Sequence, residues 1–298
     1  MTTTEQTHSL DPSLHTGNLQ AHEGELHEVM SRIVPIFELS DEEFEEALPE
    51  FVAERMTELA DGASTEVMTA QTKGTEEFIV PERPQQIMGI MTKPFLMDDP
   101  ELYIKLIEWT RKQYRDLQAA NPGFDEEKKY VNAAIRGTQV GQWAYFGSYA
   151  GSMKKLIQAS ADIISDEGDI SPYVSIAEIG GGAVCHQRAA AVHNTLRILG
   201  IDSKFATGTL SQVVEGVPGE SELHAYVVIS RNGKRILYDP TNPVAYKKEG
   251  ETVTWLAPKL TEIPADTHEL DVELPEVTIT SDGAQENQLA HHLRYTFN

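Results

Sequence analysis

The sequence has little cysteine, little positive charge and no long apolar run. Its single cysteine among 298 residues, Cys185, excludes an intramolecular disulfide and a zinc site built from several cysteines. A lone thiol is either a small buried hydrophobic group or a nucleophile. The neighbours of Cys185 in the sequence must therefore decide between a structural and a chemical role.

Basic residues are scarce, 24 against 47 acidic ones, and the formal net charge is −23. This charge opposes binding to nucleic-acid phosphates and to anionic lipid, so we expect neither nucleic acid nor membrane as a partner. No apolar run approaches the roughly 20 residues that span a bilayer. The first 20 residues lack the basic start and apolar stretch of a signal peptide. We expect a soluble, cytoplasmic protein, unless a specialised secretion route delivers it elsewhere.

The chain divides by composition into three regions. Residues 1–30 are rich in Thr, Ser, His, Gln and Glu and predict a flexible leader. Residues 31–160 show mostly helical periodicity, whereas in residues 161–298 helix, strand and hairpin signals follow one another closely. The sequence therefore predicts an α+β fold with a helical N-terminal region and a catalytic core from 161 to 298.

The helical region carries clear start and stop signals. Ser40 followed by Glu43 is a capping-box pattern that predicts a helix start, and Pro49 is expected to split or kink this helix. Further helices are expected over residues 100–120, 126–135 and 148–164. Later in the chain, the alternation in LDVELPEVTIT predicts an edge strand that tolerates Pro275.

One stretch of the helical region is strongly acidic. Between Glu38 and Glu58 there are nine acidic residues and one basic residue, Arg55. Such a run is ordinarily a solvated helix face. A docking surface for a basic protein partner is the alternative that this stretch leaves open.

Cys185 follows a glycine loop, Gly180 to Gly182, and opens the segment CHQRAAAVHNTLRILG, which predicts one helix ending near Gly200. The thiol is thus expected in the first turn of a helix. There, unpaired backbone amides and the helix dipole favour the thiolate over the thiol. The glycines would let a substrate approach closely.

His224 and Asp239 are expected to meet across a β-hairpin. His224 lies in the predicted strand ELHAYVVI, Asn232-Gly233 is a two-residue turn signal, and Asp239 ends the returning strand RILYD. A turn centred between 232 and 233 pairs residue i with residue 465 − i, which places Thr241 opposite His224. Asp239, two positions along, then lies within diagonal reach of the imidazole on the same face.

A thiol at a helix start and a histidine beside a carboxylate are the parts of a thiol catalytic triad. The imidazole would take the thiol proton, and the carboxylate would fix the tautomer of the imidazole. We therefore predict Cys185, His224 and Asp239 as catalytic residues. Cys185 and His193 are too far apart along the helix to hold one ion with His186, so no metal and no cofactor is expected.

Three segments resemble a known family: GGGAVCHQRAAAVHNTLRILGIDSKFATG, LHAYVVI and LYDPTNP, within about residues 180–243. They resemble the transglutaminase-like superfamily, whose members share a papain-like core. The resemblance implies that Cys185 is the nucleophile, His224 the general base and acid, and Asp239 the residue that orients the histidine. Tyr226 stands where members often have tryptophan. The resemblance also implies a second oxyanion donor, for which Gln139, Gln142 and Trp143 are the candidates.

The expected activity is acyl transfer from a peptide or protein amide through a thioester on Cys185. Water as acceptor would give a peptidase, an amidase or a deamidase, and an amine would give a transglutaminase. Two alternatives stay open. One is a protein-glutamine deamidase that acts as an effector or toxin, and the other is a non-catalytic binding module that kept the fold.

Overall fold

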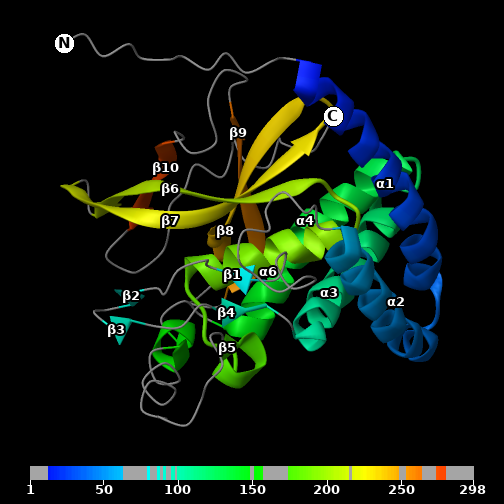
Figure 1. The fold of residues 1–298 in the computed structure, drawn as a ribbon, viewed down its shortest axis with the longest axis horizontal. Coiled ribbons are helices and arrows are strands. Elements are labelled where there is room, and N and C mark those ends of the chain that lie inside the picture. Colours follow the sequence, from blue (N-terminus) through cyan, green and yellow to red (C-terminus); the bar gives the residue numbers. More distant parts are fainter. Residues whose placement is uncertain are drawn as a thin grey trace.

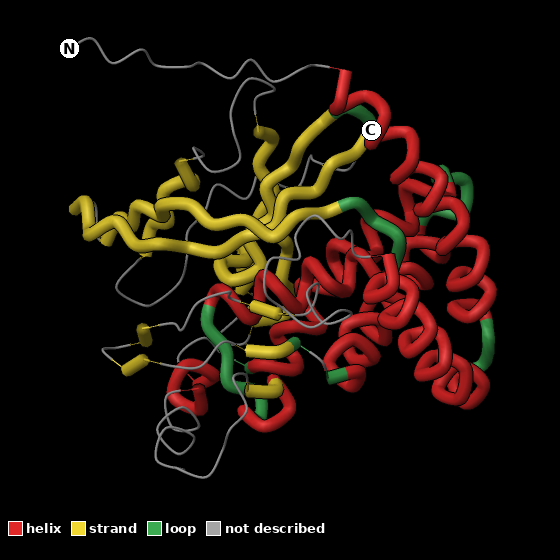
Figure 2. Tube along the Cα trace, viewed as in Figure 1, coloured by secondary structure: helices red, strands yellow, loops and turns green. Residues whose placement is uncertain are grey.

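The computed structural model describes residues 13–62, 79–80, 86–87, 90–91, 95–97, 99–147, 151–156, 174–214, 217–247, 253–263 and 273–279. Helices and strands gather in separate parts of the molecule (Figures 1 and 2). This segregation is characteristic of α+β proteins, so the α+β part of the predicted fold is confirmed.

The helices lie mostly before residue 200. They are α1 (Ser13–Glu38), α2 (Asp41–Gly62), α3 (Pro100–Ala120), α4 (Glu126–Phe146) and α6 (Cys185–Ile198), with a short 3-10 helix η3 (Ile176–Ile179) before α6. Residues 151–156 are also helical, and the rest of the helix expected over 148–164 lies outside the described residues. None of the described helices is both long and apolar enough to cross a membrane.

The main sheet has five strands in the order β10-β6-β7-β8-β9. Its strands are β6 (Ser203–Val214), β7 (Val217–Arg231), β8 (Lys234–Lys247), β9 (Val253–Ile263) and β10 (Glu273–Ile279). Neighbours are antiparallel except β10, which pairs parallel to β6 at the sheet edge. The predicted edge strand is thus confirmed, and its pairing is irregular between Leu274 and Val277, where Pro275 lies.

Two smaller sheets are built from strands of two residues each. One has the order β1-β4-β5 and the other pairs β2 with β3. These strands are β1 (Ile79–Val80), β2 (Gln86–Ile87), β3 (Ile90–Met91), β4 (Phe95–Leu96) and β5 (Val174–Ser175).

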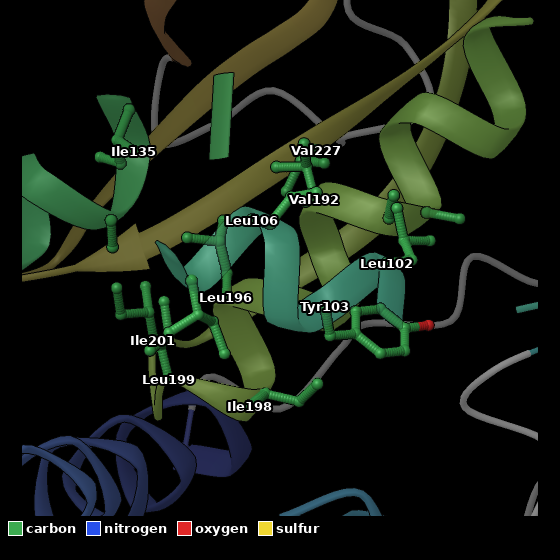
Figure 3. Packing of buried hydrophobic residues seen from close by; sticks show 14 of the residues in the cluster. Leu102, Tyr103, Leu106, Ile135, Val192, Leu196, Ile198, Leu199, Ile201 and Val227 are labelled. Atoms are coloured by element: carbon green, nitrogen blue, oxygen red, sulfur yellow. The ribbon is translucent and has the colours of Figure 1, made fainter. Parts of the chain in front are cut away.

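Helix α6 is the centre of the core. It contacts α2, α3 and α4 as well as strands β6, β7 and β8. Its alanines, Val192, Leu196 and Ile198 are fully buried, and Leu196 lies beside Leu106 of α3 (Figure 3). The small side chains let α6 lie close to its neighbours on several sides.

Helix α1 begins at Ser13, within residues 1–30, for which the sequence predicts a flexible leader. Leu26, Val29 and Met30 are buried, and Ile33 and Phe37 continue the same apolar face. The polar composition before residue 24 hid this helical periodicity. One continuous hydrophobic cluster contains residues from both sides of the predicted boundary near 160, so that boundary does not separate two cores.

Helix α2 starts as predicted. The Glu43 carboxylate accepts hydrogen bonds from the Ser40 backbone and hydroxyl, and the Ser40 hydroxyl accepts one from the Glu43 amide. The helix continues through Pro49, so of the two expected effects, a split or a kink, the split does not occur. Pro49 is exposed, so water can reach the carbonyl that loses its helical partner there.

Helix α3 has the predicted bounds, whereas α4 continues past its expected end at Ile135. Two glycines in the extension lie against α3. A Cβ on Gly137 would lie 2.3 Å from the Thr110 Cα, and one on Gly141 would lie 2.8 Å from the Leu106 Cα. These glycines let the two helix backbones approach closely, and the packing gained there outweighs their low helix propensity.

Candidate active site

The β7–β8 hairpin has the predicted register. Asn232 and Gly233 both have positive φ values, 50° and 69°, as a two-residue hairpin turn of this type requires. Arg231 pairs with Lys234 and Val227 with Tyr238, so residue i faces residue 465 − i. The turn alone therefore sets which residues of the two strands meet.

His224 and Asp239 contact each other at the far end of this hairpin. The His224 Nε2 atom lies 3.0 Å from the Asp239 Oδ1 atom, and the same oxygen accepts a hydrogen bond from the Thr241 amide at 3.0 Å. Asp239 is 1% exposed and His224 is 5% exposed. The buried carboxylate thus binds one imidazole nitrogen and leaves Nδ1 for another partner.

Cys185 is the first residue of α6, and its thiol lies close enough to the His224 side chain for the imidazole to lower the thiol pKa. Gly180 and Gly181 adopt left-handed φ values of 60° and 82° in the preceding loop. A Cβ on Gly182 would lie 2.4 Å from the Ile179 side chain and 2.6 Å from the Leu156 nitrogen. The glycines of this loop therefore allow a tight turn and close packing just before the thiol.

The segment before Cys185 is held from two directions. Residues Ser152 and Ala183 exchange hydrogen bonds, one from the Ala183 amide and one from the Ser152 hydroxyl. The side chain of Gln187 accepts a hydrogen bond from the Val184 amide at 3.1 Å. These contacts fix the start of α6 and with it the position of the Cys185 backbone.

A second histidine, His186, also contacts the thiol. Its Nδ1 atom lies 3.6 Å from the Cys185 Sγ atom, and its ring centroid lies 6.0 Å from that of Phe205 on β6. His186 is partly exposed, unlike His224. The position of His186 directly after the cysteine is the single feature of the sequence that points to this contact.

The electrostatics of the site favour an ion pair. Burial alone would raise the pKa of Cys185, but hydrogen bonds and charge from His186 and His224 lower that pKa to about 6. Burial alone would lower the pKa of His224, but the charge and hydrogen bond of Asp239, together with Cys185, raise it to about 10. Thiolate and imidazolium therefore coexist between these two pH values.

The three candidate oxyanion donors lie on α4 with different partners. The side-chain amides of Gln139 and Gln142 both donate to the Pro240 carbonyl, at 3.1 and 2.8 Å. The Trp143 ring covers the Arg188 guanidinium, with 5.0 Å between the Arg188 Cζ atom and the ring centroid. Its buried Nε1 atom has no hydrogen-bond partner within the described part of the chain. Of the three donor atoms, Trp143 Nε1 is the one without a hydrogen-bond partner among the described residues.

The described residues contain no cluster of three or more His, Cys, Asp or Glu side chains that could hold a metal ion. The His193 Nδ1 atom lies 2.9 Å from the Ser203 hydroxyl oxygen. Burial, together with the charge of Arg197, lowers the pKa of His193 to about 3. This histidine therefore stays neutral beside its hydroxyl partner at ordinary pH.

Comparison of the chain with protein-family models, curated proteins and solved structures gave no match. The geometry of the residues themselves thus carries the functional argument.

Proposed function

We propose that this protein transfers acyl groups from peptide or protein amides through a thioester on Cys185, as a transglutaminase-like enzyme with a papain-like core. The observation that carries the proposal is the buried chain of contacts from Cys185 to His224 and from His224 to Asp239. The order of the parts also agrees with such a core, because the thiol begins a helix packed on the strands that carry the histidine and the carboxylate.

The reaction begins with the thiolate. Cys185 Sγ attacks the amide carbonyl carbon, and the carbonyl π electrons move to oxygen. The Cys185 backbone amide, in the first turn of α6, would donate to this oxyanion, and the open Trp143 Nε1 is our candidate for the second donor. When the intermediate collapses, the C–N bond breaks and His224 gives its proton to the departing amine or ammonia.

The thioester is then resolved by an acceptor. His224, now neutral, takes a proton from water or from an amine as that acceptor attacks the thioester carbonyl, and Cys185 leaves as the thiolate. The Asp239 carboxylate keeps the imidazole in one orientation during both steps. The balance between water and amine decides between hydrolysis, deamidation and transamidation, so each product is an outcome of one mechanism.

The test uses the full chain with a mixture of glutamine-containing peptides, with and without a primary amine. We expect an acyl adduct on Cys185, released ammonia, and no adduct or ammonia with Cys185→Ala. Mass spectrometry of the peptides distinguishes glutamate from an amine conjugate. An alkylation assay in parallel shows whether the thiol is reactive. A thiol that is inert until the protein unfolds would overturn the proposal and favour a binding module.

The binding module has one observation in its favour. The nine acidic residues from Glu38 to Glu58 are all exposed. Part of this charge is used inside the helical region, because Arg32 binds Glu54 and Glu58 and Arg111 binds Asp41. A basic protein partner for the remaining acidic face, and a cytoplasmic location, stay predictions.

A further inference from the structure

Helix α4 contacts both halves of the candidate site, which are the cysteine helix α6 and the hairpin that carries His224 and Asp239. The Tyr238 hydroxyl, next to Asp239, contacts the Thr138 hydroxyl at 3.3 Å and the Ile135 carbonyl at 3.2 Å. The amides of Gln139 and Gln142 bind the carbonyl of Pro240, the residue after Asp239. The segment of β8 that carries the carboxylate is thus attached to α4 through successive buried hydrogen bonds.

Helix α4 is also hydrogen-bonded to α6, the helix that begins with Cys185. Arg188, one turn after Cys185 on α6, is fully buried. Its guanidinium donates to the Gln142 Oε1 atom at 2.7 Å, to the Gly147 carbonyl at 2.7 Å and to the Ser152 hydroxyl at 2.8 Å. Gln142 therefore contacts both the helix of the nucleophile and the strand of the carboxylate.

The carboxamide of Gln142 can satisfy these two partners in one orientation only. A guanidinium offers donors and no acceptor, whereas the Pro240 carbonyl offers an acceptor and no donor. With the amide reversed, its NH2 group would face the guanidinium donors and its oxygen would face the Pro240 carbonyl oxygen. Both contacts would be unfavourable in a buried site. The amide is therefore fixed, and its length sets the separation between Arg188 and Pro240.

We propose that Gln142 is a positioning residue, which aligns the thiol of Cys185 with the His224–Asp239 pair by joining Arg188 to the Pro240 carbonyl. This inference rests on the proposed function for its catalytic consequence. Gln142 acts through α6 and β8 and does not contact the reacting sulfur. A role in alignment differs from the oxyanion role expected from the sequence, because both ends of the carboxamide already have protein partners.

Gln139 is a matched control within the same helix. It is fully buried, lies one turn before Gln142 and donates to the same Pro240 carbonyl, at 3.1 Å. It does not, however, receive the hydrogen bond that Arg188 gives to Gln142. Loss of either glutamine removes a buried hydrogen bond to Pro240, but only loss of Gln142 also removes a hydrogen bond to Arg188 on the cysteine helix.

The experiment compares Gln142→Met with Gln139→Met, since methionine keeps the side-chain length and volume without the hydrogen bonds. We expect a lower Tm for both variants. We expect the midpoint of the pH profile of Cys185 alkylation to rise by about one pH unit for Gln142→Met, and by clearly less for Gln139→Met. A merely stabilising contact would lower Tm and leave the midpoint unchanged. Equal shifts in the two variants would likewise overturn the bridging role.

A second Gln142 variant and an NMR titration of His224 complete the experiment. If Gln142→Met does not fold, as judged by circular dichroism, Gln142→Asn takes its place, because its shorter amide cannot reach both partners. NMR titration of the His224 ring separates this inference from the proposed function. If the native thiol titrates like a free thiol, the proposed function fails. The positioning role would still hold if the His224 pKa fell in the Gln142 variant and not in the Gln139 variant, and would fail if neither moved.

Discussion

The Nδ1 atom of His186 lies 3.6 Å from the sulfur of Cys185, so the thiol has two imidazole neighbours, His186 and His224. Both lower the pKa of the thiol against the opposing effect of burial. The thiolate is consequently not dependent on a single base. This distinguishes the site from a simple thiol–imidazole pair and changes what a single substitution should do.

Removal of one of the two histidines should raise the pKa of the Cys185 thiol only part of the way toward that of an ordinary thiol. We expect His224→Ala and His186→Asn each to raise the alkylation midpoint of Cys185 above about 6. The double variant should reach or exceed the ordinary thiol value of about 8.5, because burial then acts alone. The measurement is the rate of iodoacetamide labelling against pH, with His193→Gln as a control that keeps the native midpoint. A double variant no different from His224→Ala would exclude His186 from the site.

Asp239→Asn should remove most of the support for the charged imidazole. Burial would then act largely unopposed on the His224 pKa, which should fall well below its native value of about 10. In the proposed mechanism, kcat would fall by about 10⁴-fold, as expected when the imidazole loses the partner that orients it. Asp202→Asn serves as the charge control. A ring titration of His224 that stays near 10 would contradict this role of Asp239.

The same substitution should alter stability with a defined dependence on pH. The folded protein raises the His224 pKa, so the resulting stabilisation is complete below the ordinary histidine pKa of about 6.5. It is lost as the pH rises through about 10. The difference in unfolding free energy between native protein and Asp239→Asn should therefore shrink from pH 6 to pH 10. Urea unfolding at these pH values measures it, and a difference that grew with pH would be inconsistent with the ion pair.

Trp143→Phe tests the oxyanion donor. The substitution keeps an aromatic ring over Arg188 and removes the buried Nε1 hydrogen-bond donor. If this donor stabilises the oxyanion, kcat should fall by about 10²- to 10³-fold. Alkylation of Cys185 forms no oxyanion, so its pH profile should stay the same. Trp109→Phe, whose ring stacks with Lys112 on α3, is the control. Unchanged turnover in Trp143→Phe would assign the second donor to another group.

The contact between His224 and Asp239 could be predicted because it depends on one short turn. Once Asn232-Gly233 fixes the hairpin, the pairing from Arg231–Lys234 to Val227–Tyr238 follows by counting, and His224 and Asp239 lie just beyond it. The position of Cys185 was equally local, since the glycine loop and the start of α6 are neighbours in the sequence. Local signals of this kind are independent of how distant elements pack.

The contacts that join distant elements could not be predicted in this way. Arg55 on α2 donates to the carbonyls of Arg197 and Ile198 at the end of α6, more than a hundred residues away. Gln142 binds Arg188 and Pro240 on two different elements. Such partners depend on the docking of whole helices, which composition and periodicity leave undetermined. The sequence showed Arg55 only as the single base in an acidic run.

The close packing of α3 against α4 provides a test of the frame that holds the site. In Gly137→Ala, the new Cβ would lie 2.3 Å from the Thr110 Cα, a backbone atom that cannot move away without separating the helices. We expect a loss of about 1–3 kcal/mol in unfolding free energy from this overpacking. Gly24→Ala is the matched control, because it lies in α1 and its added Cβ would meet no other packed element within 4 Å in the part of the chain that the structure describes. Helix propensity alone should stabilise that variant by about 0.5–1 kcal/mol. Urea unfolding followed by circular dichroism measures both changes, and equal effects of the two substitutions would mean that α3 and α4 are not held this closely in solution.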